Sequence, residues 1–119
     1  HAYSVFATGG KELGLREETL RQLMAPPVAP LKGFRDGALK VEIAFSLGFT
    51  KPSPKNPFGS PSSFGAPGMG GSFGFADPQA EIGYGYVLNG MGTSLEDPRE
   101  HALRNAMYRS IGETDPYHE

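Results

Sequence analysis

The stretch FGAPGMGGSFGFADP at residues 64–78, followed by IGYGYVLN at residues 82–89, determines the expected fold. Aromatic and apolar residues alternate with glycine in both parts, which is typical of β-strands. Pro78 presets the backbone angle that the second position of a type I turn needs. We therefore expect strands over residues 71–77 and 81–89, joined by a tight turn at residues 77–80. Their glycines leave one face thin enough for a helix to approach closely.

The residues before this pair predict two helices, a further strand and a long loop. Residues 2–8 have the character of a helix that glycine ends, and residues 15–25 form an amphipathic helix that ends at two prolines. Residues 41–49 alternate between apolar and small or polar side chains without a break, which predicts one strand. Residues 50–65 hold four prolines and four serines, so we expect a functional loop, a mobile loop or a flexible linker there.

A final helix is predicted over residues 97–112. Asp97 can cap it, Pro98 suits its first position, and glycine ends it. Its apolar residues Leu103, Met107 and Ile111 share one face, which we expect to pack on the sheet. Residues 113–119 are predicted to be a polar tail.

These elements predict an α/β chain of the α+β type, with an antiparallel sheet flanked by helices in a single segment spanning residues 1–119. The chain starts at His1 rather than at a methionine, and the first helix has no N-cap residue before it. Both features suggest a fragment or a processed chain.

Composition excludes several classes of function. The chain has 119 residues, 17 glycines, 11 prolines and no cysteine, so a zinc finger, a disulfide framework and a thiol nucleophile are excluded. A net charge of −2 argues against nucleic acid as the main partner. No apolar stretch approaches the roughly 18 residues that a membrane span requires. The absence of cysteine is compatible with either redox environment, so the compartment stays open.

Motifs within the chain do not assemble a complete active site. The glycine-rich run at residues 65–72 has no following lysine and leads into a predicted strand, which argues against a phosphate-binding loop. Glycines that permit a bulge or close packing are the alternative interpretation. His1, His101 and His118 lack the spacing of a metal site and suit a solvated surface. No Ser-x-x-Lys nucleophile motif occurs in the chain.

The same residues resemble a known family. The runs at 64–78 and 82–89, then Asp97-Pro98-Arg99 and a last helix, are similar to the C-terminal part of the β-lactamase-like serine hydrolases. This penicillin-recognising group, unrelated to the serpins, includes class C β-lactamases, penicillin-binding-protein-like peptidases and carboxylesterases, and the esterase branch is the most similar. Thr8-Gly9-Gly10, the Leu15–Thr19 segment and Leu47-Gly48-Phe49 resemble further family segments upstream.

The resemblance implies a function for the glycine run. The family's third active-site motif, Lys-Thr-Gly or His-x-Gly, would fall on Ala66, Pro67 and Gly68. Met69 would then supply a backbone N–H to the oxyanion hole, where negative charge develops on an acyl carbonyl. Gly70 and Gly71 would let the backbone approach substrate closely. The nucleophile motifs would lie outside these residues, in the remainder of a parent chain.

Ala66 departs from the family pattern, because a lysine or histidine usually stands at this position. A methyl group can neither take part in proton transfer nor attract a carboxylate. The change therefore argues against β-lactam or peptidoglycan substrates and leaves neutral esters or amides.

Three hypotheses follow. The first is part of a serine hydrolase, esterase-like, that acts through an acyl-enzyme on a small ester or amide without any cofactor. The second is a catalytically inactive relative with a binding or structural role, which Ala66 motivates. The third is an independent small domain that shares only the glycine pattern.

Overall fold

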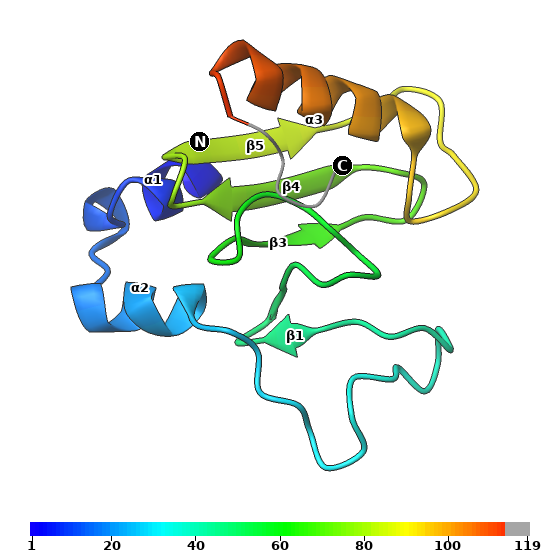
Figure 1. The fold of residues 1–119 in the computed structure, drawn as a ribbon, viewed down its shortest axis with the longest axis horizontal. Helices are drawn as coiled ribbons and strands as arrows, with labels where there is room; N and C mark the ends of the chain where they lie inside the picture. The colour runs from blue at the N-terminus through cyan, green and yellow to red at the C-terminus, as the bar shows by residue number, and fades with distance from the viewer. Residues whose placement is uncertain (114–119) are drawn as a thin grey trace.

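The computed structural model describes residues 1–113, in which helices flank an antiparallel sheet (Figure 1). Within these residues five strands form one sheet in the order β1-β2-β3-β4-β5. The α+β fold class is therefore confirmed. In chain order the elements are α1 Ala2–Ala7, the 3-10 helix η1 Lys11–Leu13, α2 Glu17–Met24, β1 Phe45–Ser46, β2 Phe49–Thr50, β3 Phe64–Pro67, β4 Phe73–Asp77, β5 Ile82–Tyr86 and α3 Pro98–Ser110.

The pairing register divides the sheet into two faces. Gly65 pairs with Phe75 and Phe75 with Tyr84, so these residues share the face that α3 covers. An aromatic core fills that face and includes Phe58 and Tyr108, which are almost fully buried. The opposite face packs against α1 and α2, in a second core made of Ala7, Leu20, Phe64 and Ala76.

The thin face of the β4–β5 hairpin receives α1, as the glycine pattern predicts. A side chain at Gly83 would place its Cβ 2.1 Å from the backbone nitrogen of Ser4. Such a distance is far inside van der Waals contact, so only glycine permits this approach. The predicted turn at residues 77–80 also forms, with the Asp77 carboxylate accepting hydrogen bonds from the amides of Gln79 and Ala80.

The prediction of one strand over residues 41–49 is wrong. The chain reverses at Leu47 and Gly48, both of which have positive φ, and Ser46 pairs with Phe49 across the turn. The result is a short hairpin of β1 and β2 with a two-residue turn. Alternation of apolar residues is equally compatible with a hairpin, because each arm keeps its own period of two.

The predicted packing face of α3 is wrong for two of its three residues, since only Met107 packs against the aromatic core. Leu103 and Ile111 are 54% and 48% exposed, whereas Glu100, Arg104 and Tyr108 are buried at intervals of four residues. The Arg104 Nε lies 3.6 Å from a Glu100 carboxylate oxygen, and its guanidinium lies 5.4 Å from the centre of the Phe73 ring. The buried charges are therefore paired and stacked on an aromatic ring, which reduces the cost of their desolvation.

The ends of α3 match the prediction. The Asp97 side chain accepts a hydrogen bond from the Arg99 amide, and Pro98 occupies the first position. Gly112 has positive φ directly after the helix, and its amide donates to the carbonyl of Arg109. The predicted tail, apart from its first residue Glu113, lies outside the described residues.

The segment between β2 and β3 is packed against the sheet. Phe58 and Ser63 are fully buried, and the Ser60 hydroxyl donates to the Asp77 carboxylate over 2.6 Å. The Tyr108 hydroxyl donates to the same carboxylate over 2.7 Å. Asp77 thus joins this segment, the β4–β5 turn and α3.

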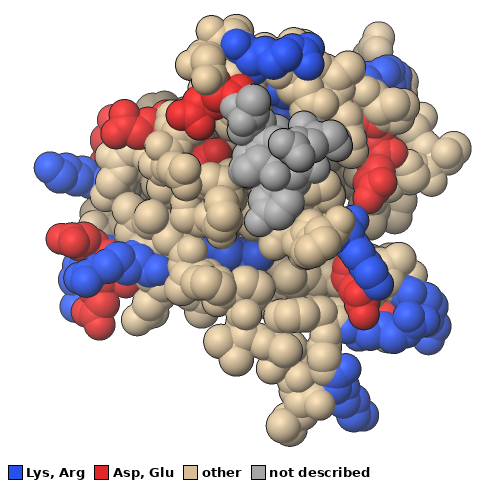
Figure 2. Space-filling view, in the orientation of Figure 1, with Lys and Arg blue, Asp and Glu red and all other residues tan. Residues whose placement is uncertain are grey.

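None of the described helices is both long enough and apolar enough to cross a membrane. On the face drawn in Figure 2, basic and acidic side chains lie next to one another rather than in separate patches.

Candidate functional site

The glycine run forms the turn between β3 and β4. The Gly68 amide donates to the carbonyl of Ser72 over 2.7 Å, and the Gly71 amide donates to the carbonyl of Gly68 over 3.1 Å. Ala66 and Pro67 end β3, and the next residues make a tight turn rather than extending the strand. All of the residues predicted for the site, Ala66, Pro67, Gly68, Met69, Gly70 and Gly71, therefore lie together at one end of the sheet.

The Met69 amide lies at the second position of the turn that the hydrogen bond between the Gly71 amide and the Gly68 carbonyl closes. Along β3 the backbone groups alternate: those of Gly65 face β2, and the Gly68 amide faces β4. Within residues 1–113 the Met69 amide donates to no backbone oxygen, and the Met69 side chain is 66% exposed. An N–H on a hydrogen-bonded turn that is not shared with a backbone oxygen can serve an oxyanion.

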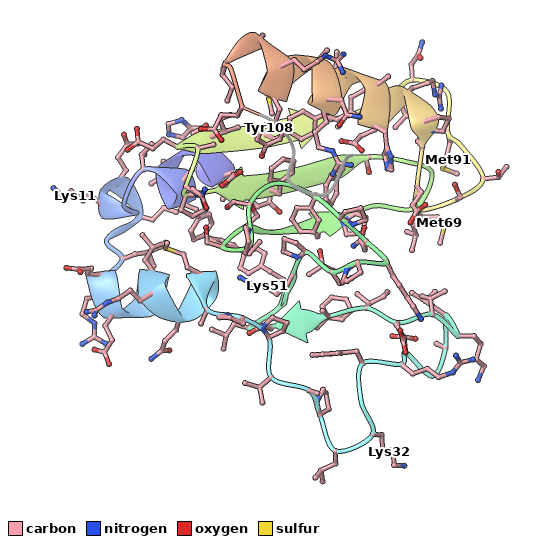
Figure 3. The ribbon with its side chains drawn as sticks, viewed as in Figure 1. Lys11, Lys32, Lys51, Met69, Met91 and Tyr108 are labelled. Carbon is pink, nitrogen blue, oxygen red and sulfur yellow. The ribbon has the colours of Figure 1, made fainter. Side chains whose placement is uncertain are left out.

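The loop between β5 and α3 contacts this turn and supports it. The Gly92 amide donates to the carbonyl of Gly70 over 2.7 Å. A Cβ at Gly71, whose φ is +106°, would lie 2.7 Å from the Cβ of Asp97. The contact and the backbone angle together require glycine at position 71. Met69 and Met91 accordingly lie near each other at the same end of the molecule (Figure 3).

An ion pair fixes the bracing loop. The Arg99 guanidinium donates to the Asp97 carboxylate over 2.7 Å and to the carbonyl of Gly90 over 3.1 Å. Hydrogen bonds from the Arg99 side chain and from its amide hold the pKa of Asp97 down at about 2. Asp97 therefore stays ionised at neutral pH and keeps Gly90, Gly71 and the start of α3 together.

Ala66 lies on the face of the sheet that α1 and α2 cover. It pairs with Gly74, and its side chain is exposed to solvent. At Gly74 the ring of Tyr3 takes the space of a side chain, since a Cβ there would lie 2.6 Å from the ring. Ala66 therefore lies on a part of this face that α1 does not cover. Its methyl group carries no charge that could attract a ligand.

A cavity of about 690 Å³ lies beside Pro67. Its walls come from the segment before β1, from the start of the segment after β2, and from the loop before α3. Sequence patterns did not identify it, because its walls are far apart in the chain. The lining residues are Arg35, Lys40, Val41, Glu42, Ile43, Lys55, Asn56, Pro67, Ser94, Leu95 and Glu96.

Lys51 is a second feature that the sequence did not single out. It is 1% exposed, its ammonium donates to the carbonyl of Leu23 over 2.5 Å, and it lies 5.3 Å from the centre of the Phe64 ring. Burial lowers the pKa of Lys51 to about 8. Its contact with the last turn of α2 indicates a structural role, because a cation satisfies the free carbonyls there.

The chain also contains a serine motif, centred on Ser72, that was not identified from the sequence. Residues 70–74 read Gly-Gly-Ser-Phe-Gly and match Gly-x-Ser-x-Gly, the pattern of a hydrolase nucleophile elbow. An elbow needs a strand, a sharp turn and then a helix, whereas Ser72 leads from a hairpin turn into β4. The context therefore does not support Ser72 as a nucleophile.

Histidine and carboxylate side chains form no candidate metal site within the described residues. His1 is exposed and lies 3.2 Å from Glu12, while His101 lies 3.8 Å from Glu100. His118 lies outside residues 1–113.

Three solved structures have this fold, and about a third of their aligned residues are identical to those of this chain. A penicillin-binding protein homologue from Caulobacter crescentus matches 92% of this chain with a TM-score of 0.77 and 31% identity. A family VIII carboxylesterase matches 90% with a TM-score of 0.73 and 33% identity. EstA from Arthrobacter nitroguajacolicus Rue61a matches 82% with a TM-score of 0.66 and 33% identity.

The chain spans only 30%, 29% and 25% of these three proteins, respectively. No protein-family model and no curated protein sequence matches it. The relationship therefore concerns one portion of much longer chains.

Proposed function

The chain resembles part of the β-lactamase-like serine hydrolases in fold and at 31–33% sequence identity, and we propose that it is the C-terminal part of an esterase-like member. The observation that supports this proposal most directly is the Met69 amide, which lies on a supported, exposed turn and donates to no backbone oxygen of the described residues. The nucleophilic serine belongs to the remainder of the parent chain, since these 119 residues contain no Ser-x-x-Lys motif.

In the proposed reaction a serine oxygen adds to the carbonyl carbon of an ester or amide while its proton passes to a neighbouring base. The carbonyl oxygen becomes an oxyanion and accepts a hydrogen bond from the Met69 amide. Expulsion of the protonated alcohol or amine leaves an acyl-enzyme, which water then hydrolyses. A donor that is already in place costs no reorganisation when the charge develops, which lowers the barrier.

The substrate in this proposal is neutral close to its carbonyl. Ala66 offers no cation to a carboxylate, and the nearest part of its face carries Gly74 and the ring of Tyr3. A β-lactam or a peptidoglycan peptide would gain nothing from that surface, whereas a neutral ester needs no charge there.

Ala66 also supports a second candidate, a catalytically inactive relative that binds a ligand or serves a structural role. Catalysis with an alanine at this position would need another group to assist proton transfer. The second candidate predicts that a reactive serine is absent.

Labelling of the complete protein that contains these residues, using a fluorophosphonate probe and intact-mass spectrometry, separates the two candidates. A mass increase of one phosphonyl group supports the hydrolase. An unlabelled protein that is otherwise folded supports the inactive relative.

A further inference from the structure

We propose that the cavity beside Pro67 binds a neutral, apolar substituent of the ester, the acyl chain or the alcohol group. The inference rests on the proposed hydrolase function, and it adds where the substrate extends and which chemistry is selected. The position, lining and size of the cavity support it.

The position follows from the pairing of β3. The β2 strand pairs with β3 only at Thr50 and Gly65, so the edge of β3 beyond that point has no neighbouring strand within the described residues. The cavity lies at Pro67, on this unpaired stretch. Pro67, which lines the cavity, lies only two residues before Met69 in the chain. A carbonyl held at Met69 would therefore have one substituent next to the cavity.

Four apolar residues from three parts of the chain contribute to the lining. Pro67 contributes from β3, Leu95 from the loop before α3, and Val41 and Ile43 from the segment before β1. Transfer of an alkyl or aryl group from water to such a surface is favourable by about 0.8 kcal/mol for each buried CH₂.

Charged residues in the lining do not create a strong preference for an anion. Lys55 lies 2.5 Å from the Glu42 carboxylate, so these two charges compensate each other. Arg35 and Lys40 are on exposed positions, where solvent screens them, and Glu96 contributes an opposing charge. We therefore infer a neutral group and not a carboxylate.

The volume suits a substituent of moderate size. About 690 Å³ falls within the roughly 300–1,000 Å³ typical of small-molecule sites. A space of this size accommodates a medium-length acyl chain or a naphthyl group.

The first test is equilibrium binding of Prodan, a neutral naphthyl ketone whose emission shifts to shorter wavelength in apolar surroundings, to the complete protein. We expect saturable binding. Val41→Arg, at a residue that is already 45% exposed, should weaken it by about tenfold or more because the guanidinium would enter the apolar space. Leu103→Arg, at an exposed leucine on α3, is the matched control and should bind as wild type does.

This readout does not depend on catalysis. Absence of saturable binding to wild type would overturn the proposal and would indicate that other parts of the protein fill the cavity. Equal affinity of wild type and Val41→Arg would overturn it as well, as would displacement of the probe by octanoate at concentrations at which octanol has no effect.

The second test compares, ester by ester, the ratio of the variant to wild type for three substrates that differ in the acyl chain or in the alcohol group. Val41→Arg should lower kcat/KM about tenfold for p-nitrophenyl octanoate or for octyl acetate, with p-nitrophenyl acetate affected less than twofold. Loss confined to the octanoate assigns the acyl chain to the cavity, and loss confined to octyl acetate assigns the alcohol group. Equal losses on all three esters would contradict the proposal. A wild-type protein that binds Prodan but hydrolyses no ester would reject the hydrolase function instead.

Discussion

At one end of β4 the Asp77 carboxylate is 1% exposed and hydrogen-bonded to Ser60, Gln79 and Tyr108, whereas at the other end Met69 is 66% exposed. The first end joins three parts of the chain through one side chain. The second is held through backbone bonds and through Asp97, which leaves its outer surface uncovered. The same strand thus carries an anchor at Asp77 and an open turn at residues 68–72.

The difference shows how the molecule separates stability from chemistry. A buried, fully hydrogen-bonded carboxylate stabilises the fold but has no oxygen left for a ligand. A turn that is braced from one side can present an amide outward without losing its geometry. We therefore expect changes at Asp77 to affect folding and changes at Met69 to affect catalysis.

Asp77→Ala should have the largest effect. The change removes the acceptor of the Ser60 and Tyr108 hydroxyls in a buried site, so we expect the free energy of unfolding to fall by about 3–5 kcal/mol. Urea denaturation followed by circular dichroism measures this loss. Asp77→Asn retains one carbonyl acceptor and should lose less; equal losses in the two variants would show that the hydrogen bonds are not the cause.

Tyr108→Phe removes a single donor from the anchor. The Tyr108 hydroxyl donates to a charged acceptor over 2.7 Å, so we expect a loss of about 1.5–3 kcal/mol. Thermal unfolding of this variant beside Tyr86→Phe, whose residue is only partly buried on β5, provides the comparison. If Tyr108→Phe unfolds at the same temperature as wild type, the hydrogen bond between Tyr108 and Asp77 does not contribute to stability.

Local chemistry explains which elements the sequence predicted correctly. The Asp77–Ala80 turn and the Asp97 cap each depend on residues within a few positions, so a pattern can identify them. The alternating glycines of β4 and β5 predict a thin face in the same way, although the pattern does not say that α1 covers it. The Tyr108–Asp77 bond joins residues 31 positions apart, and no local pattern encodes it.

Two failures have specific physical causes. Alternation over residues 41–49 fits a hairpin as well as a strand, and Gly48 decided the outcome. On α3, the apolar pattern does not identify the buried face, because Arg104 and Glu100 pair with each other in the interior. The site residues at the end of β3 are assigned from the resemblance and remain a prediction. The contact of this turn with Asp97 and the adjacent cavity involve chain segments that only the fold brings together.

The pH dependence of stability tests the Asp97–Arg99 ion pair, which supports the open turn at residues 68–72. Because the pKa of Asp97 is about 2 in the folded protein, below its ordinary value, Asp97 contributes stability at neutral pH that is lost as the pH falls from 4 towards 2. Arg99→Gln should remove part of this acid-sensitive stability. Unfolding measured at pH 7, 4, 3 and 2 should therefore show a smaller decrease for the variant; identical curves would exclude Arg99 as the cause.

Leu103→Asp should have the smallest effect. Leu103 is 54% exposed on the outer face of α3, away from the anchor, so we expect a change in unfolding free energy within about 0.5 kcal/mol. A loss of several kcal/mol in differential scanning calorimetry would show that this face is buried in the complete protein.

The most direct test of the open turn compares Met69→Pro with Met69→Ala in ester hydrolysis by the complete protein. Met69 has no positive φ and is the second residue of a turn, where proline fits, so Met69→Pro removes the N–H while keeping the backbone path. We predict that kcat falls by about 10²–10³ for Met69→Pro and changes little for Met69→Ala. Equal kcat values for two folded variants would contradict the assignment of the Met69 amide as an oxyanion donor.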